Sequence, residues 1–290
     1  MPLKHTRTFR VRYYECDAYG HLNSVNYLRY MQETAFDASA AAGYDLQRYA
    51  EMNRYWLIRE TDIEYFESVP YNAEIELTTW ITDFRRVTSR RIYEFRRPET
   101  PELLARAYTD WVFMNTKSRQ PAAIPETLIA AFYPEGAPAQ FPVRPSFPQP
   151  PPPPSGAFTA RRSVEWHDLD AMLHVNNAVY MSYANECGFQ CIAAFGWPWE
   201  RLMENKLAIF IRRCQMQYLH PARYGDELEI TTWVSGVRRS TAMRHYSIRR
   251  AGDGALLYQA NMLGVWVNTE SGKPMRIPPD FLEDFAPNIV

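Results

Sequence analysis

Residues 17–27 read Asp-Ala-Tyr-Gly-His-Leu-Asn-Ser-Val-Asn-Tyr, a polar loop that runs directly into a helical pattern. Residues 170–180 read Asp-Ala-Met-Leu-His-Val-Asn-Asn-Ala-Val-Tyr, so the same residue types return 153 positions later. The offset holds without a gap along the chain, as in the pairs Arg59/Arg212, Tyr71/Tyr224, Trp80/Trp233, Tyr93/Tyr246 and Pro121/Pro274. This period is far longer than the roughly 20–50 residues of a stacked repeat, so we interpret the chain as a tandem duplication of one whole domain.

Length and composition agree with two soluble domains. The chain has 290 residues and is 46% hydrophobic, which allows a sizeable core in each half. Its 32 basic and 33 acidic residues give a net charge of −1, which argues against nucleic-acid binding driven by overall charge. No apolar run approaches the ~18 residues of a membrane span, and the N-terminus lacks the apolar stretch of a secretory signal. We therefore expect a cytoplasmic protein.

The four cysteines form no CxxC pair, and three of them lie in the second half. This spacing predicts neither a repeated metal site nor a disulfide framework, and we expect no metal and no cofactor. We expect Cys187 and Cys191, four residues apart on a predicted helix, to be small buried thiols.

Each copy is predicted to contain one long helix and a series of strands, an α+β fold. The first helix is predicted at residues 25–42, between a cap at Asn23 or Ser24 and Gly43, and the second at residues 177–195. Strands are predicted at residues 6–14, 56–66, 73–84, 89–97 and 103–115, and again at 160–166, 207–218, 227–237, 241–250 and 255–268. Since most of each helix is apolar, we expect a curved antiparallel sheet wrapped around it, with Glu33 and Glu186 on the buried side and paired internally.

The first domain is expected at residues 1–133 and the second at 157–290, joined by a proline-rich linker at 134–156. Such a linker has no core to join and favours an extended polyproline II conformation. About 15 of its residues at roughly 3.1 Å each span some 45 Å, which is enough for the second copy to begin beside the first. We therefore expect the two copies to pair as a pseudo-dimer within one chain, and two such chains to form a homodimer.

The duplicated motif resembles that of a known family. The first copy resembles the hotdog-fold thioesterases of the 4-hydroxybenzoyl-CoA thioesterase type. The resemblance rests on a tyrosine-rich strand followed by Asp-x-x-Gly-His-x-Asn, with a Tyr six residues after the His and a Glu six residues after that Tyr. The second copy, with Asp168-Leu-Asp170 and His174-Val-Asn-Asn177, resembles the plant and bacterial acyl-ACP thioesterases, which are tandem hotdogs. The resemblance covers nearly the whole chain except the linker. It implies two tandem hotdog domains, each a sheet around a central helix, paired back to back with active sites between them.

Two positions depart from the family pattern. Acyl-ACP thioesterases carry an Asn two residues after the loop Asp, where this chain has Tyr19 and Met172. The glycine at Gly20, which permits a tight turn, is replaced by Leu173 in the second copy. Gly20 slightly favours the first loop as the working site, whereas the second loop lies nearer the acyl-ACP pattern.

The duplicated loop contains candidates for thioester hydrolysis. This reaction requires a base or nucleophile and donors for the developing oxyanion, and it requires no metal because thiolate is a good leaving group. Asp17 and Asp170 are the candidate carboxylates, and His21 and His174 are candidates to orient them or share a proton. The start of the following helix directs backbone N–H groups at the same loop. We therefore predict hydrolysis of fatty acyl-ACP or acyl-CoA by Asp-assisted attack of water.

Other residues are candidates for binding the substrate. Asn23 and Asn176 either cap their helices or position a water molecule. The remaining candidates beside the loops are Asn26, Tyr27, Asn177 and Tyr180, although tyrosines at these spacings also suit a core. The pairs Arg85-Arg86 and Arg238-Arg239 suit the phosphates of coenzyme A or an acidic carrier protein, and solvated strand ends explain them equally well.

Two alternative functions remain open from the sequence. A hotdog hydratase or dehydratase also uses Asp and His, but as base and acid on carbon. A non-catalytic protein that binds acyl thioesters would bind the same ligands without releasing a thiol. The acyl chain length and the choice between coenzyme A and carrier protein also remain open.

Overall fold

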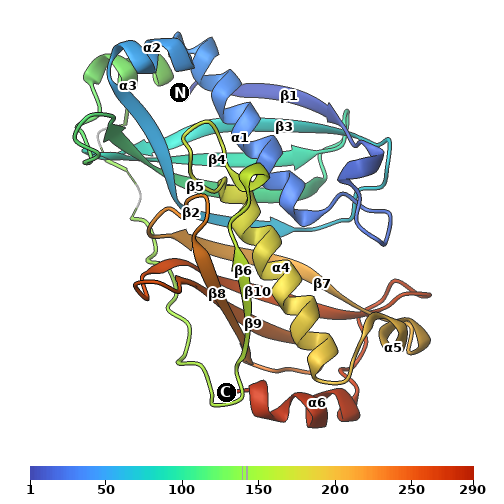
Figure 1. Cartoon of the computed structure of the whole chain (residues 1–290). Coiled ribbons are helices and arrows are strands. Elements are labelled where there is room, and N and C mark those ends of the chain that lie inside the picture. Colours follow the sequence, from blue (N-terminus) through green and yellow to red (C-terminus); the bar gives the residue numbers. More distant parts are fainter. Residues whose placement is uncertain (139, 142) are drawn as a thin grey trace. The chain divides into compact units, whose positions relative to one another are not determined.

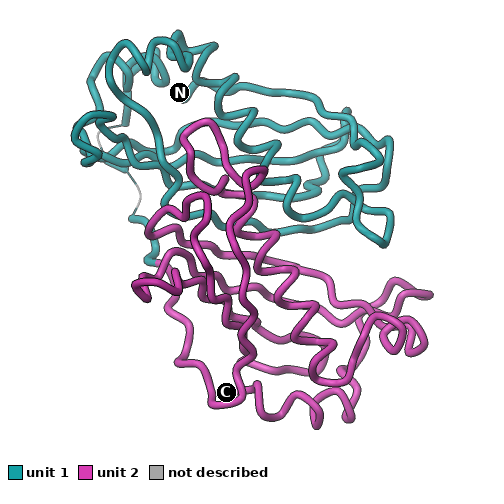
Figure 2. Tube along the Cα trace, in the orientation of Figure 1, with its two compact units in different colours: residues 1–146 teal, residues 147–290 magenta. Residues whose placement is uncertain are grey.

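The computed structural model describes residues 1–138, 140–141 and 143–290, which divide into two compact units, residues 1–146 and 147–290 (Figure 2). In each unit one long helix lies along a five-stranded antiparallel sheet (Figure 1). The elements of the first unit are β1 His5–Arg10, α1 Ser24–Ala41, α2 Leu46–Glu51, β2 Arg54–Tyr65, β3 Glu74–Phe84, β4 Thr88–Arg96, β5 Leu103–Asn115 and α3 Glu126–Phe132. Those of the second are β6 Phe158–Ser163, α4 Asn177–Ala194, α5 Trp199–Glu204, β7 Leu207–Tyr218, β8 Glu227–Ser235, β9 Thr241–Arg250, β10 Leu256–Asn268 and α6 Pro279–Phe285.

The duplication seen in the sequence is also present in the structure. The strand order is β1-β3-β4-β5-β2 in the first unit and β6-β8-β9-β10-β7 in the second, which is the same topology. The long helices α1 and α4 have 18 residues each and start 153 positions apart, at Ser24 and Asn177. The predicted strands and long helices are confirmed, with differences of a few residues at their ends.

The helix α1 buries one side against the sheet and leaves the other side in solvent. Its buried residues include Tyr27, Met31 and Ala35, which follow a helical spacing. The prediction that Glu33 and Glu186 lie on the buried side is wrong, because both side chains are exposed. Glu33 lies 3.7 Å from Arg7 Nη1 at the surface, so solvent rather than an internal partner stabilises its charge.

Two further differences from the sequence prediction have local reasons. The first strand ends at Arg10 rather than residue 14, because Glu15 Oε2 accepts a hydrogen bond from the backbone N–H of Arg12 at 2.8 Å and closes a 3-10 turn. The short helices α2, α3, α5 and α6 were not predicted. Each has only 6 or 7 residues, which is too short to establish a helical period.

The linker contributes to the core, contrary to our expectation that it has none to join. Arg144 forms an ion pair with Asp83 in the first unit, and Phe147 is buried in the second. Backbone oxygens of Pro148 and Pro151 accept hydrogen bonds from Asn261 Nδ2 at 2.7 Å and Trp233 Nε1 at 3.1 Å. Both ends of the segment are therefore held by side chains of the unit that they adjoin.

No helix in the described part of the chain has the length and apolar character needed to cross a membrane.

Candidate active site

The loop before α1 is a hydrogen-bonded turn built on Asp17. Its Oδ1 accepts hydrogen bonds from the backbone N–H groups of Tyr19 at 2.9 Å and His21 at 3.1 Å. The backbone of Asp17 and His21 closes the turn, with Asp17 N donating to His21 O at 2.7 Å. Since Asp17 is only partly buried, its Oδ2, which these two bonds do not engage, is placed to meet a water molecule or a substrate.

The loop before α4 repeats this turn around Asp170. Its Oδ1 accepts a hydrogen bond from Met172 N at 2.9 Å, and its backbone N–H donates to His174 O at 2.9 Å. Gly20 has a φ of 79°, as its sequence position suggested, and Leu173 adopts a φ of 59° at the equivalent position. A leucine in this left-handed region costs roughly 1–2 kcal/mol, so the second copy keeps the loop shape at an energetic cost.

The two histidines share their backbone with the turn. The hydrogen bonds that join Asp17 to His21, and Asp170 to His174, run through the backbone atoms of each histidine. Both imidazoles are partly buried. His21 and His174 therefore hold the shape of the loop through their backbone atoms. Their rings belong to the same short turn as the carboxylates.

A second acidic residue in each copy lies beside a tyrosine of the long helix. Glu15 Oε2 accepts a hydrogen bond from Tyr30 of α1 at 2.6 Å, and in the second copy burial and the neighbouring Asp168 raise the pKa of Tyr183 of α4 above its usual value. Burial and this contact with Glu15 raise the pKa of Tyr30 far above its usual value, so it remains a neutral donor. Our sequence reading missed this role, although an acidic residue at the same position of both copies was a signal for it.

The asparagines have mainly structural contacts. Asn23 Oδ1 caps α1 by accepting from Val25 N at 3.0 Å, and Asn176 Oδ1 caps α4 by accepting from Ala178 N at 3.0 Å. Asn26 is buried and donates to Glu15 O at 2.8 Å, which joins the helix to the loop. Asn177 is the first residue of α4, and its backbone oxygen accepts from Tyr218 at 3.2 Å.

The tyrosines six residues after each histidine belong to the core. Tyr27 packs edge-on against Tyr65 with ring centroids 5.1 Å apart, and burial followed by the charge of Asp17 raises its pKa above the usual value. The hydroxyl oxygen of Tyr180 accepts from Ala222 N at 2.8 Å, and burial raises its pKa to about 12. Both hydroxyls therefore remain protonated at neutral pH and are able to donate a hydrogen bond.

The arginine pairs lie at the opposite end of the sheet from the loop of the same unit. The loop follows β1, whose last residue Arg10 pairs with Glu74 at the start of β3, whereas Arg85 follows the end of β3 (Figure 1). The 11 residues of β3 separate the two ends by roughly 35 Å. Arg238 and Arg239 follow β8 in the same way, and all four arginines are exposed.

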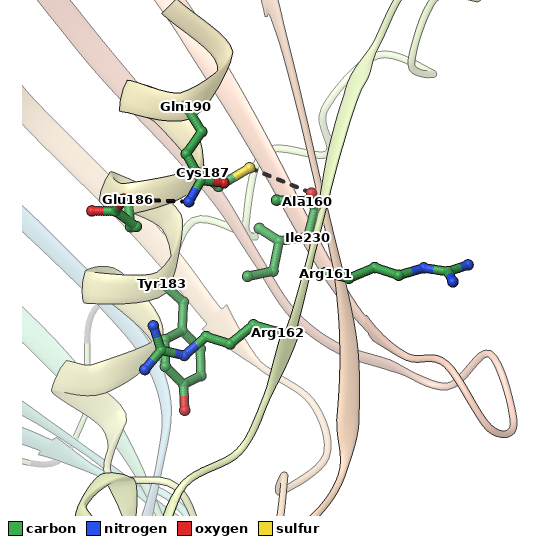
Figure 3. A pocket seen from close by; sticks show the side chains of 8 residues that line it. All are labelled: Ala160, Arg161, Arg162, Tyr183, Glu186, Cys187, Gln190 and Ile230. Atoms are coloured by element: carbon green, nitrogen blue, oxygen red, sulfur yellow. Dashed lines mark hydrogen bonds between the residues drawn. The ribbon is translucent and has the colours of Figure 1, made fainter. Parts of the chain in front are cut away.

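A small hollow lies between α4 and β6 in the second unit (Figure 3). Its volume is about 90 Å³, which is well below the ~300 Å³ of a small-molecule site, so an acyl chain does not fit in it. Cys187 lines it and donates to Ile230 O at 3.4 Å. Burial raises the pKa of this thiol to about 12, so Cys187 is not a nucleophile; both Cys187 and Cys191 are buried, as predicted.

Glu165, His167 and Asp168 place three possible metal ligands together in the second loop. The two ring nitrogens of His167 face different carboxylates, at 3.5 Å from Glu165 and 3.6 Å from Asp168, so the ring does not direct one atom at a shared ion. Arg162 already lies 4.0 Å and 3.9 Å from the same carboxylates. This arrangement suits an ion-pair cluster better than a metal site.

The two halves of the chain match two families. Residues 2–132 match the family described as acyl-ACP thioesterase N-terminal domain, and residues 164–285 match the thioesterase-like superfamily. Over 189 residues the chain is 25% identical to a chloroplastic acyl-[acyl-carrier-protein] hydrolase of Cuphea viscosissima, which covers 62% of this chain and 46% of that protein. The chain thus spans about half the length of this relative. A shorter relative, an acyl-CoA thioester hydrolase of Escherichia coli, is 27% identical over 122 residues, 42% of this chain and 90% of its own.

Solved structures show the same fold over almost the whole chain. A 12:0-ACP thioesterase from Umbellularia californica superimposes with a TM-score of 0.73 at 20% identity and covers 91% of this chain and 94% of its own. An acyl-ACP thioesterase from Bacteroides thetaiotaomicron gives a TM-score of 0.70 at 19% identity and covers 90% and 97%. The fold is therefore that of the hotdog thioesterases.

Proposed function

Both halves of this chain belong to thioesterase families, and from that premise we propose that the protein hydrolyses fatty acyl thioesters of acyl carrier protein or coenzyme A. The observation that supports this most directly is the duplicated loop. It holds a partly buried carboxylate, Asp17 or Asp170, by backbone N–H groups just before the start of a long helix. A carboxylate held in this way is suited to accept a proton from water beside the positive end of a helix.

In the proposed reaction, the aspartate takes one proton from a water molecule whose oxygen bonds to the acyl carbon. The carbon–sulfur bond then breaks, and the thiolate leaves with the electron pair of that bond. The neutral hydroxyls of Tyr27 and Tyr180 are the donors proposed for the developing oxyanion. The backbone N–H groups of Val25 and Ala178 at the helix starts already donate to the Asn23 and Asn176 caps. His21 and His174 orient the turn around the carboxylate.

A panel of acyl chain lengths on coenzyme A and on carrier protein tests this proposal by measuring release of free thiol. We expect thiol release, with a preference for one carrier and a limited range of chain lengths. A change in enoyl absorbance without thiol release would instead identify a hydratase or dehydratase. Thermal shifts with the same ligands but no product of either kind would identify a binding protein and contradict the proposal.

We also propose that residues 1–133 and 157–290 are two hotdog domains joined by residues 134–156, and that they pair within one chain. The uninterrupted offset of 153 residues and the common strand order of the two units support this. Residues 1–140 expressed alone are then expected to be unstable or to pair with themselves. A stable monomer with a full melting transition would contradict the pairing.

The four exposed arginines are proposed to bind the phosphates of coenzyme A or the acidic surface of a carrier protein. Replacing Arg85, Arg86, Arg238 and Arg239 by Ala is expected to raise KM several-fold and weaken its salt dependence while kcat changes little, because the charges act on encounter and binding. Steady-state kinetics at two ionic strengths measure this. Arg161→Ala, which removes an exposed arginine paired with Glu229 on β6 and β8, is the matched control. An unchanged KM in the fourfold variant would assign these arginines to the solvated surface.

A further inference from the structure

Three polar side chains form a hydrogen-bonded row on β8, β9 and β10 of the second unit. Ser235 Oγ lies 2.7 Å from His245 Nε2, and His245 Nδ1 lies 2.6 Å from Asn261 Oδ1. We propose that Ser235 is an activated nucleophile, with His245 as its general base and Asn261 as the positioning residue, and that it accepts acyl groups from esters or thioesters that carry an anionic group. This site shares no residue with the Asp17 and Asp170 loops and does not depend on their function.

The strand register brings the three residues together. His245 of β9 is directly opposite Asn261 of β10 and Trp233 of β8, and Ser235 lies two residues further along β8 on the same face. The neighbouring Arg244 points the other way, to Cys191 of α4 at 3.4 Å. The row therefore lies on the face of the sheet opposite α4.

The hydrogen bonds determine which nitrogen of His245 carries the proton. Asn261 Nδ2 donates to the backbone oxygen of Pro148, which only accepts, so Asn261 Oδ1 is the acceptor that faces His245. His245 Nδ1 must then carry a hydrogen, and Nε2 is left with its lone pair toward Ser235. The serine hydroxyl donates to that lone pair, which is the arrangement that a general base needs before it removes the serine proton.

Burial supports the same roles. His245 and Asn261 are each 4% exposed, whereas Ser235 is partly exposed at the end of its strand. Burial lowers the pKa of His245 below its usual value, so its imidazole is neutral and able to accept a proton at neutral pH. The base is thus protected from water, and the nucleophile remains reachable.

The residues after Ser235 suggest the class of substrate. Gly236 has a φ of 57° and begins the turn, which leads to the exposed Arg238 and Arg239. Cations that follow a nucleophile by three and four residues favour a substrate that carries a carboxylate or phosphate. Glu227, at the other end of β8, lies beside the Asp170 loop. Ser235 is eight residues further along the strand, roughly 26 Å away, so the two sites are separate.

The proposed step needs only the acyl substrate and water. Ser235 Oγ bonds to the carbonyl carbon while His245 Nε2 takes the hydroxyl proton. The bond from that carbon to the leaving oxygen or sulfur then breaks, and His245 returns the proton to the leaving alcohol or thiol. Water repeats the sequence on the acyl-serine and releases the acid.

The first copy has the same fold without this row. The positions 153 residues earlier are Thr82, Ile92 and Tyr108, so the first copy has an isoleucine at the position of His245. A hotdog sheet of this sequence family therefore forms without a serine, histidine and asparagine in these places. The fold itself does not require the row.

Incubating the full chain with diisopropyl fluorophosphate tests the proposal, because this probe phosphorylates activated serines with loss of fluoride. Intact mass and peptide mapping are expected to show one adduct, on Ser235. Ser235→Ala is expected to abolish it, and His245→Gln to slow its formation by about 10²-fold. Ser247→Ala, which removes a partly buried serine on the same face of β9, is the matched control and is expected to label like the unchanged protein. No adduct on Ser235, or equal labelling of the His245→Gln protein, would overturn the proposal.

A second pair of variants separates positioning from a structural contact with the linker. Asn261→Asp keeps an oxygen that accepts from His245 Nδ1 but loses the donor to Pro148, whereas Asn261→Ala loses both. We expect Asn261→Asp to keep most of the labelling rate and Asn261→Ala to lose about 10-fold or more, with folding checked by melting. Equal losses in both would assign Asn261 to the linker contact and overturn its positioning role. Labelling needs no thioester, so these results are independent of the thioesterase assay.

Discussion

Replacing Asp17 and Asp170 together by Asn is expected to lower kcat for thioester hydrolysis by about 10²-fold or more. An amide has almost the shape of the carboxylate and still accepts the backbone hydrogen bonds that hold Asp17 and Asp170 in their turns. It does not accept a proton from water at neutral pH, so the variant removes the base and keeps the loop. Thiol release at saturating substrate measures the effect, and the melting temperature of each variant checks the fold.

The single variants show which loop is active. We give Asp17 a slight preference, because its carboxylate has two backbone donors and its turn has a glycine where the second copy has Leu173. If Asp17→Asn alone reproduces the full loss, the first loop is the working site, and the same result for Asp170→Asn selects the second. Losses of about half in each would indicate two independent sites. Full activity of the double variant would contradict the aspartate mechanism.

Asp110→Asn is expected to destabilise the first unit by about 3–5 kcal/mol. Arg90 donates from Nε and Nη2 to the two oxygens of Asp110 at 2.7 Å each, and both side chains are about 10% exposed. Removing one charge leaves the other largely buried without its partner, and Arg144 at 3.5 Å also loses a counter-ion. A shift of about 10 °C in the melting temperature is expected for a domain of this size, measured by calorimetry.

The second copy suggests the matched control for this prediction. At the positions of Arg90 and Asp110 it has Met243 and Leu263, which are paired across β9 and β10 in the same register. The double variant Arg90→Met with Asp110→Leu is therefore expected to recover most of the lost stability, because a packed apolar pair avoids the cost of burying two charges. Glu67→Gln, in an exposed pair with Arg97, should change stability by less than about 1 kcal/mol. A loss as large as that of Asp110→Asn in the double variant would show that the ion pair itself stabilises the unit.

The long elements were predictable because their signals are local. Residues 24–41 carry a helical apolar period between the asparagine cap and Gly43, and β3 alternates in its burial over most of its length. Glu33 was misplaced because a period identifies the apolar side of a helix but not how far the sheet wraps around it. The helices α2 and α3 were missed because they cover fewer than two turns.

The candidate site was predictable only in part. Asp17, His21 and Asn23 were singled out because the motif recurs as Asp170, His174 and Asn176, and the structure places each set in one turn. The repeated acidic position at Glu15 and Asp168 carried the same signal, but its closeness to a helix tyrosine depends on how the loop folds back.

The sequence by itself determined the duplication, the element types and the loop that precedes each long helix, because these depend on residue types at fixed short spacings. Only the tertiary structure decided which distant side chains meet. Ser235, His245 and Asn261 come from three strands and span 26 residues, and Arg90 and Asp110 are 20 residues apart. Such pairs depend on strand register and on which face of the sheet a residue occupies. No local pattern in the chain encodes that register, because it follows from burying the apolar face of every strand at once.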